Sequence, residues 1–517
     1  MPTLSFDEQI GQLIIALWPG DPAETAALVA QGRIGGLLIP AEAARGEGEL
    51  VEALGRLQRL ATYPLLCIGD AEGGLGPLVP GALALAAARR PDLARRAGAL
   101  AAAEARARGL QMVLAPPFDV QRDPGPLPLA GPSLGDNPPL VARLAAAFVE
   151  GCQGAGALAV GRYFPGRGGA VYDADNRRWV LAHDRSTLEK LDLPPYVEAC
   201  RAGLAAIMTG HLHVAALDHL PSRLATHSSA VVDGLLRRSL RFEGLLLSNN
   251  LDAPEVRARY GPAEAAVLAF AAGHDLLVTE SPGQAYRALY EVLRNGDIPA
   301  SRLEDAMARI GACRAWLRER EESAQGWTPG SPAADALALG PTLAREVAEA
   351  SLALLRGRPD LLARPGLLVV ANHLARLDGS QVDEELQRLA ASYIGEPSFH
   401  LLDARRASEQ LDTILDAAAM APAALLFLGL PPGREAHSPI EASVALAQTL
   451  KRAGLPVGVV VMGSPYPLAR FGEADLLLYS PGDAPAYLEA LFACLRGELA
   501  PCGHLPMHVQ GVAQTVV

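Results

Sequence analysis

Short apolar runs alternate with longer stretches rich in Ala, Leu and Arg through roughly the first 320 residues. Such runs, bounded by Gly, Pro or polar residues, are typical of buried parallel strands, and the stretches between them have the composition of helices. Eight strands are predicted, at Ile10–Ala16, Gly35–Ile39, Pro64–Ile68, Met112–Ala115, Leu158–Tyr163, Ala205–Met208, Gly244–Ser248 and Asp275–Val278. Eight strands with intervening helices predict an α/β fold that begins with a (β/α)8 TIM-like barrel, whose functional residues follow the strands.

A break in this pattern predicts a second domain. The charged helical segment Arg318–Ala324 gives way to Gly326–Pro332, which has the composition of a linker. A helix is expected over about Ala333–Leu355. Strands are then predicted at Leu367–Ala371, Ala424–Leu428, Val457–Met462 and Leu476–Tyr479. Fewer strands over this length favour a three-layer α/β sandwich. The expected division is a barrel at 1–325, a linker and connecting helix at 326–345, and a C-terminal sandwich at 346–517.

The composition narrows the function classes. Half of the 517 residues are hydrophobic, which suits large buried cores, and the net charge of −12 argues against non-specific binding to nucleic acid or anionic membranes. Neither a secretory signal nor a membrane-spanning apolar stretch is evident. The six cysteines lack the CxxC spacing of zinc sites. We therefore expect a cytoplasmic protein with reduced thiols and with no metal or cofactor. The bias toward Ala, Leu, Gly and Arg is typical of a GC-rich, bacterial genome.

The seventh predicted strand ends in an unusual polar pair. The apolar run Gly244–Leu247 is followed by Ser248, Asn249 and Asn250. A buried barrel strand delivers catalytic groups to its carboxyl end in this way. Both asparagines are neutral, so this strand brings no carboxylate to the barrel mouth.

Other strand ends carry motifs that share one resemblance. The motifs are Ile68–Gly74, Gly131–Asp136, Arg162–Gly168, Gly169–Asp175, Met208–His211 and, near the C-terminus, Gly497–Pro506. In this order they resemble glycoside hydrolase family 3 of the β-N-acetylglucosaminidase type, and the resemblance covers nearly the whole chain. It implies the same two-domain fold and a pocket for a sugar at the barrel mouth.

The resemblance also assigns the catalytic positions, and here the chain departs from the family. The family's nucleophile is the first Asp of Ser-Asp-Asp/Ala, where this chain has Asn249. An amide cannot attack an anomeric carbon as an anion. The family's acid/base loop ends in Asp-Ser-His; Asp173 matches the Asp, and Asp175 stands in place of the His. An Asp protonates a leaving group only when its pKa is raised. The alternative is a pair of solvated loop aspartates.

A further acid and five binding residues complete the candidate site. Glu435 lies where the β-glucosidase branch of the family places an acid/base Glu, although an exposed loop Glu is the alternative. The resemblance gives sugar contacts to Asp70, Arg162, Tyr163 and His211, with Asn249 beside them. Asp70 has an alternative role as a turn cap. Three arginines of the family are replaced, by Leu75, Leu78 and Pro132.

Three functions follow from these residues. The first is a family 3 protein that has lost hydrolysis and binds a sugar, a muropeptide-like fragment or a regulatory partner. The second is an active β-N-acetylglucosaminidase or β-glycosidase that uses Asp173, Asp175 or Glu435. If inverting, it needs two carboxyl groups about 6.5–9.5 Å apart. The third is a structural or homo-oligomeric role with a filled mouth.

Overall fold

The computed structural model describes residues 4–20, 22–44, 48–70, 78–122, 133–220, 222–323, 337–359, 366–372, 382–403, 407–430 and 437–513. The chain forms two compact units. The first comprises Met1–Val79, Ala94–Val120 and Val141–Gly340; the second comprises Pro80–Leu93, Gln121–Leu140 and Pro341–Val517. The division is therefore not a single cut along the sequence, because two segments within the first 140 residues belong to the second unit.

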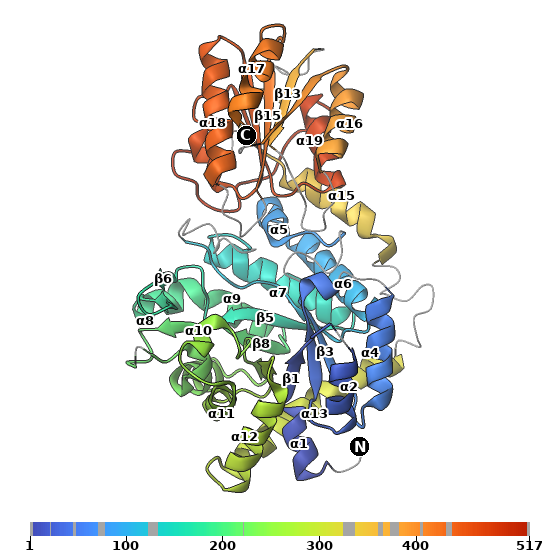
Figure 1. The fold of residues 1–517 in the computed structure, drawn as a ribbon, viewed down its shortest axis with the longest axis vertical. Helices are drawn as coiled ribbons and strands as arrows, with labels where there is room; N and C mark the ends of the chain where they lie inside the picture. The colour runs from blue at the N-terminus through green and yellow to red at the C-terminus, as the bar shows by residue number, and fades with distance from the viewer. Residues whose placement is uncertain are drawn as a thin grey trace. The chain divides into compact units, whose positions relative to one another are not determined.

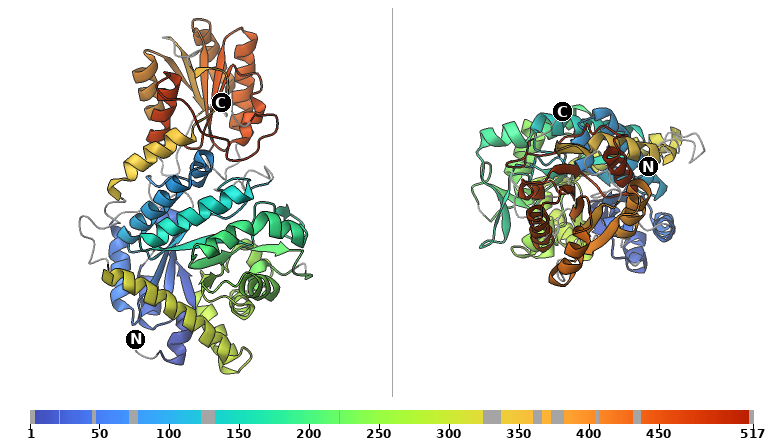
Figure 2. Two further views of the ribbon diagram at one scale, coloured as in Figure 1. Left: turned by 180° about the vertical axis from the view of Figure 1, so that it is seen from behind. Right: turned by 90° about the horizontal axis from the view of Figure 1, so that it is seen from above.

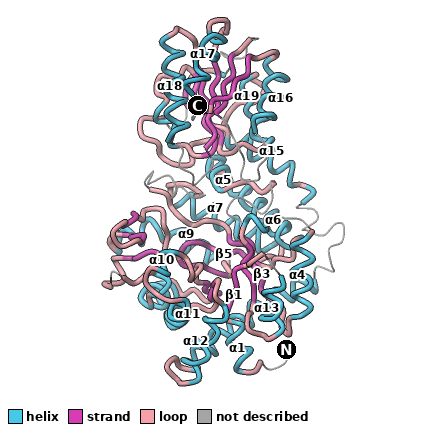
Figure 3. Tube along the Cα trace, viewed as in Figure 1, coloured by secondary structure: helices cyan, strands magenta, loops and turns pink. Residues whose placement is uncertain are grey.

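The first unit contains the predicted barrel (Figures 1 and 3). Its strands are β1 (Ile14–Leu17), β2 (Gly36–Ile39), β3 (Leu66–Asp70), β4 (Met112–Leu114), β5 (Leu158–Phe164), β8 (Ala206–Thr209), β10 (Leu245–Leu247) and β11 (Leu277–Thr279). Neighbouring strands are parallel in the order β10-β8-β5-β4-β3-β2-β1-β11. A parallel bridge between Leu247 and Leu276 nearly closes the ring. Each of the eight predicted strands corresponds to one of these, as the continuous apolar runs of a doubly covered parallel sheet allow.

Helices surround the barrel strands (Figure 2). The principal ones are α1 (Phe6–Gln12), α2 (Pro22–Ala30), α4 (Glu49–Leu60), α6 (Pro91–Ala107), α7 (Pro138–Gly154), α9 (Pro194–Arg201), α11 (Pro262–Ala272), α12 (Pro282–Arg294) and α13 (Ala300–Ser323). Shorter helical segments are α3 (Ala41–Ala44), α8 (Arg185–Thr187), α10 (Pro254–Arg257), and the 3₁₀ and π segments Leu188–Asp192, Ala225–His227 and Ala230–Ser239.

One boundary of the predicted barrel was wrong. The first strand was expected to begin at Ile10, but Ile10 lies in helix α1 and the strand begins at Ile14. Ser5 and Glu8 form a capping box that starts this helix. The reciprocal bonds of a capping box satisfy the first free backbone N–H groups, and this local signal prevails over the apolar run that follows.

A small second sheet is attached to the barrel. Strands β6 (Val171–Asp173) and β7 (Arg178–Leu181) form an antiparallel hairpin after β5. Strand β7 also pairs in parallel with β9 (Leu212–Val214), which follows β8. The loop that the resemblance makes the acid/base loop is therefore part of a three-stranded sheet.

The second unit contains a six-stranded sheet of order β12-β17-β16-β15-β13-β14. Its strands are β12 (Ala353–Arg356), β13 (Leu368–Asn372), β14 (Ser398–Leu402), β15 (Ala424–Leu430), β16 (Val457–Gly463) and β17 (Leu476–Ser480). Alternate strand residues face opposite ways. Leu368, Val370 and Leu426 pack with helices α17 (Ala407–Ala418) and α18 (His437–Arg452). Val369, Leu425 and Phe427 pack with α16 (Val382–Ile394) and α19 (Pro485–Leu495). This is the predicted three-layer sandwich.

The two strands that sequence reasoning missed, β12 and β14, are the two edges of this sheet. In β14 the polar Ser398 and His400 interrupt the apolar run, whereas in β12 the apolar run Leu352–Leu355 continues from the preceding helix and was assigned to it. The helix expected over Ala333–Leu355 ends earlier: among the described residues α15 spans Gly340–Ser351, and Ala353–Arg356 pairs antiparallel with β17.

Two early segments are attached to the C-terminal part of the second unit. Helix α5 (Ala82–Ala88) accepts a backbone bond at Ala87 from His504, 3.0 Å long. Gly135 lies so close to Pro506 that a Cβ would stand 2.6 Å from the Pro506 carbonyl oxygen. The His508 backbone N–H donates to Asp136 at 2.6 Å. The motifs Gly131–Asp136 and Gly497–Pro506 thus meet within one unit.

None of the helices in the described part of the chain combines the length and the hydropathy that crossing a bilayer requires.

Candidate functional site at the carboxyl ends of the barrel strands

The candidate residues follow parallel strands and so gather at one end of the barrel. Asp70 is the last residue of β3, and Arg162 and Tyr163 lie near the carboxyl end of β5. His211 follows β8, and Asn249 follows β10. Leu75, Pro132 and Glu435 lie outside the described residues.

Two aspartates and two arginines surround Tyr163. The Arg162 guanidinium donates to Asp70 at 2.9 Å and to the Tyr163 hydroxyl at 3.4 Å. On the other side, the Arg167 guanidinium lies 3.8 Å from the centre of the Tyr163 ring. Arg167 donates to Asp119 through its backbone N–H at 2.8 Å and through Nε at 3.3 Å. We call this chain of contacts, Asp70–Arg162–Tyr163–Arg167–Asp119, the mouth chain.

Burial makes the mouth chain an internal structure. The Arg162 side chain is 1% exposed, Asp70 keeps 26% of its side-chain exposure, and Tyr163 is buried. A charge so deeply buried must be paired, because the cost of desolvation otherwise prevails. Arg162 and Tyr163 were predicted to contact a ligand. Both make their observed polar contacts within the protein, and the members that reach solvent are Asp70 and Arg167, the latter with 30% of its side chain exposed.

His211 is held on both sides of its ring. Its Nδ1 lies 2.9 Å from Thr226 Oγ1, and its Nε2 lies 2.7 Å from the backbone carbonyl of Asn250. A carbonyl only accepts, so Nε2 carries the proton in this bond. Burial lowers the His211 pKa, opposed by the bond to Asn250. His211 therefore ties the loop after β10 to the barrel interior.

A chain of buried polar groups continues behind His211. Thr226 Oγ1 lies 3.1 Å from Thr209 Oγ1, which lies 2.9 Å from His274 Nε2. Nearby His227 is also buried. Burial lowers the pKa of His227 and of His274 to about 3. Neutral imidazoles are metal ligands elsewhere, but among the described residues no group of three or more His, Cys, Asp or Glu side chains has metal-binding geometry.

The loop of Asn249 contains one carboxylate, and it is fully engaged. Asn249 is half-buried, and its Oδ1 accepts from the Asn250 backbone N–H at 2.8 Å. Asp252 accepts from Thr279 Oγ1 at 2.6 Å, Glu280 N at 2.7 Å, Ser281 Oγ at 3.0 Å and Arg257 at 3.2 Å. Burial opposes these bonds, yet together they hold the Asp252 pKa below its usual value. Asp252 therefore acts as a tie between the loops after β10 and β11.

Asp173 closes the turn of the β6–β7 hairpin. It accepts from the Asn176 side chain at 2.9 Å, from the Asn176 backbone at 3.2 Å and from Arg178 at 3.2 Å. The bonds from Asn176, followed by that from Arg178, lower the Asp173 pKa. Asp175 is exposed on the same turn. An acid catalyst needs the opposite shift, a pKa raised toward neutrality.

Arg259, which sequence reasoning missed, fixes the tip of this hairpin. Its guanidinium donates to the backbone carbonyls of Asn176, at 2.5 Å, and of Arg177, at 3.4 Å. Arg177 has a left-handed backbone, with φ of 47°. Thr226 and His274 were missed as well. A single Arg, Thr or His in a loop carries no periodic signal, so only the fold brings these residues to the site.

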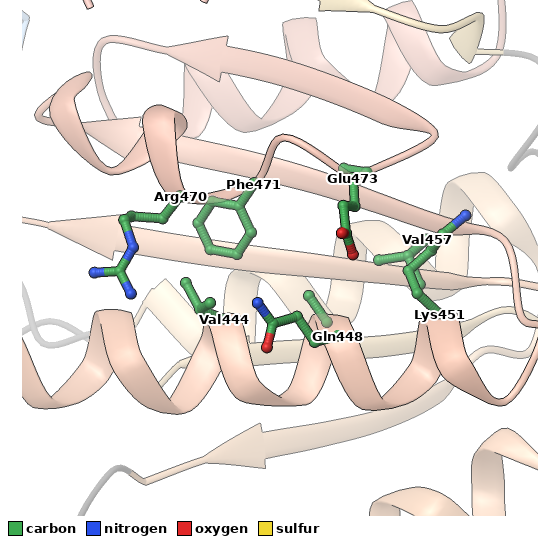
Figure 4. Close-up of a pocket in the computed structure, with 9 residues that line it drawn as sticks. Val444, Gln448, Lys451, Val457, Arg470, Phe471 and Glu473 are labelled. Atoms are coloured by element: carbon green, nitrogen blue, oxygen red, sulfur yellow. The ribbon is translucent and has the colours of Figure 1, made fainter. Parts of the chain in front are cut away.

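Figure 4 shows a cavity in the second unit that is a poor candidate for a sugar pocket. It lies between α18 and the segment Arg470–Ala474 and has a volume of about 30 Å³. Phe471 and Glu473 line one side, and Val444 and Gln448 of α18 line the other. Small-molecule sites are about tenfold larger. This cavity has the size for a few waters at most.

The fold and the site define a class: a two-unit α/β protein with a TIM-like barrel and a polar, arginine-rich mouth. The chain belongs to glycosyl hydrolase family 3, because the model of the family's N-terminal domain matches residues 5–312. It is 34% identical over 278 residues to a β-hexosaminidase of Thioalkalivibrio sulfidiphilus, covering 51% of this chain and 78% of that protein.

Two further relatives extend the likeness. The chain is 29% identical over 386 residues to a β-N-acetylglucosaminidase/β-glucosidase of Cellulomonas fimi, covering 69% of this chain and 65% of that protein. It is similar over 100% of both chains to the structure of a family 3 β-N-acetylglucosaminidase from a Paenibacillus species, with a TM-score of 0.83 and 25% identity. The family expected from the motifs is thus confirmed.

Proposed function

We propose that this family 3 chain does not hydrolyse glycosides and that its barrel mouth binds a carbohydrate-type ligand or serves a regulatory role. One observation carries the proposal: five carboxylates at or beside the strand ends each have an arginine within 3.5 Å. The pairs are Asp70–Arg162, Asp119–Arg167, Asp173–Arg178, Asp252–Arg257 and Glu280–Arg257. A carboxylate engaged by an arginine must give up that contact before it can attack an anomeric carbon or deliver a proton.

The nucleophile position supports the proposal. By resemblance, the family's nucleophilic Asp corresponds to Asn249, and the side-chain oxygen of Asn249 accepts a bond from the next backbone N–H. Asp252 is the nearest carboxylate along the chain, and four donors occupy it. Reacting atoms must approach within about 3–3.5 Å in a near-attack geometry. Asp252 would have to give up several bonds to reach a sugar.

The candidate proton donor, Asp173, also supports the proposal. Asp173 matches the family's Asp by resemblance, but its lowered pKa keeps it ionised at neutral pH. The hairpin that carries Asp173 and Asp175 is paired to β9 and tied down by Arg259. A hydrolase requires a group that delivers a proton to the leaving oxygen. A low-pKa carboxylate in a fixed turn is poorly suited to that step.

The ligand groups that fit such a mouth are uncharged hydroxyl and amide groups. The arginines and carboxylates of the mouth are paired with each other, so a charged ligand group gains little from a new ion pair with them. The partly exposed Asp70 carboxylate and Asn249 amide can bond to hydroxyl groups. N-acetylated sugars and muropeptide-like fragments offer such groups. The relatives named as β-hexosaminidases make this ligand class the first to test.

An active β-glycosidase is the second candidate. Glu280 favours it, because this carboxylate is 44% exposed and contacts the Asn250 side chain at 2.8 Å, next to the nucleophile position. Asp175 is also exposed. These groups would form a rearranged acid/base set that activates water, as in an inverting enzyme.

A paired assay on the purified full chain separates the two. Hydrolysis of aryl β-N-acetylglucosaminide and aryl β-glucoside is measured beside thermal shifts with N-acetylglucosamine and N-acetylmuramic acid. We expect no turnover and a rise in Tm with at least one sugar, because a ligand of the native state stabilises it. Turnover that disappears in Glu280→Gln or Asp175→Asn would establish the glycosidase instead. No response in either assay would contradict sugar binding and leave a protein partner.

A further inference from the structure

A second hollow lies at the opposite end of the barrel strands. It is a groove of about 400 Å³ lined by residues at the amino ends of β5, β8 and β10 and by one face of helix α13. This volume lies within the range of small-molecule sites, about 300–1,000 Å³. All of its lining residues belong to the first unit.

Small residues on both walls keep the groove open. Ala308 and Ala312 lie one turn apart on α13, and Gly203 and Gly244 form the facing wall. A Cβ on Gly244 would stand 2.4 Å from the Ala205 carbonyl oxygen, so the backbone there admits no side chain. Trp316, one turn beyond Ala312, adds an aromatic surface. The groove is therefore mainly apolar and suited to a flat group.

A positively charged cluster adjoins the groove. The buried carboxylate of Asp275 is surrounded by Arg237 at 2.6 Å, Arg309 at 3.1 Å and Arg302 at 3.5 Å. Arg309 lines the groove, and the carbonyl of Gly244, another lining residue, accepts from Arg237 at 2.7 Å. Three guanidinium groups share one buried carboxylate beside an apolar wall, so Arg309 shares its partner Asp275 with two other arginines.

Burial and the neighbouring charges act on the arginines of this cluster. Burial, together with the neighbouring Arg309 and Arg302, lowers the Arg237 pKa to about 10, although Asp275 opposes the shift. Arg302 Nη1 is buried and makes no hydrogen bond within the described residues. Arg309 keeps 29% of its side-chain exposure, so it is the arginine of the cluster that a solute in the groove can reach.

We propose that this groove binds a small ligand that carries a flat apolar group and one anionic group. The anion pairs with Arg309, and the apolar group lies along Ala312 against Trp316. Arg309 and Trp316 are seven residues apart on α13, which corresponds to roughly 10 Å along the helix. Glu243 at the rim repels a second anionic group. This site is independent of the barrel mouth and of the sugar ligand proposed there.

Titration calorimetry on the full chain tests the proposal with four probes: 1-naphthyl phosphate, 1-naphthoate, neutral 1-naphthol and inorganic phosphate. We expect one or both naphthyl anions to bind more tightly than naphthol or phosphate alone. The naphthyl phosphate and naphthoate arms distinguish a phosphate-bearing from a carboxylate-bearing ligand. Binding must be unaffected by N-acetylglucosamine, which separates this groove from the mouth.

Three variants locate the binding. Arg309→Gln should weaken the naphthyl anion about tenfold, because a charge-assisted hydrogen bond is lost. Arg309→Lys should keep most of the affinity, and Ala312→Leu should abolish it by filling the groove. Each variant is first checked for an unchanged melting transition. The proposal is overturned if no naphthyl anion binds at millimolar concentration, or if binding survives both Arg309→Gln and Ala312→Leu.

Discussion

The Arg167 guanidinium lies 3.8 Å from the centre of the Tyr163 ring. Tyr163 supplies a π face and Arg167 a cation, so the two side chains attract each other. Arg162 then extends the contact to Asp70, and Asp119 extends it on the other side. Three residues for which the resemblance implied sugar contacts, Asp70, Arg162 and Tyr163, thus contact one another here.

This relationship predicts that Arg167→Ala destabilises the protein. The variant loses the cation–π contact and the Nε bond to the nearly buried Asp119 carboxylate, which keeps its bond from the backbone N–H of residue 167. We expect a loss of about 2 kcal/mol in the free energy of unfolding, measured by urea denaturation. The matched control is Arg185→Ala, whose exposed pair with Glu189 should contribute less than about 1 kcal/mol. Equal effects of both variants would contradict a structural role for the mouth chain.

The Asp70–Arg162 pair allows a second prediction. Asp70→Ala removes a carboxylate that pairs with the fully buried Arg162 guanidinium, and we expect a loss of about 3 kcal/mol. The double variant Asp70→Ala/Arg162→Met removes the buried charge as well. It should therefore be more stable than Asp70→Ala alone. A double variant less stable than the single one would show that the arginine is held chiefly by other contacts.

Which structural elements can be predicted from the sequence depends on how clear their hydrophobic pattern is. The eight barrel strands and four central strands of the second sheet are continuous apolar runs, and periodicity finds them. The edge strand β14 carries no such run, and the apolar run of β12 was assigned to the preceding helix. Asp70, Arg162, Tyr163, His211 and Asn249 were predicted from the family resemblance, and the structure places them at or near the carboxyl ends of barrel strands.

The contacts that those residues make could not be predicted from the sequence. Arg162 was expected to face a ligand, whereas it is 1% exposed and bonds to Asp70. The ties made by Arg259 and Thr226 join segments 83 and 15 residues apart in the chain. Such contacts depend on where loops from different strands meet, and no local pattern encodes that.

The tie between Arg259 and the β6–β7 hairpin gives a third prediction. Arg259→Ala removes the bonds to the Asn176 and Arg177 carbonyls, so the hairpin should open more often. Hydrogen exchange should quicken over Val171–Leu181 by severalfold and stay unchanged in the barrel strands. Arg257→Ala is a useful comparison, because Arg257 bonds to Asp252 and Glu280 and not to the hairpin. Unchanged exchange in Arg259→Ala would show that pairing with β9 alone holds the hairpin.

The buried histidines predict how stability depends on pH. His227 and His274 have folded pKa values of about 3, while an unfolded histidine titrates near 6.5. Between these values the unfolded state binds more protons, so the stabilisation present above about pH 6.5 is lost as the pH falls toward 3. Each histidine contributes a slope of about 1.4 kcal/mol per pH unit within this window.

In the upper part of this pH window, the histidines contribute to the pH dependence of stability and the aspartates do not. The lowered pKa values of Asp173 and Asp252 affect stability only where unfolded aspartates titrate, near pH 4 and below. Urea denaturation between pH 6 and 5 should therefore report the histidines. His274→Gln should reduce the slope there by about 1.4 kcal/mol per pH unit, while exposed His219→Gln should leave it unchanged. If His274→Gln does not alter this slope, His274 is already protonated in the native state. The additional proton would then belong to the hydrogen-bonded chain of His274, Thr209 and Thr226.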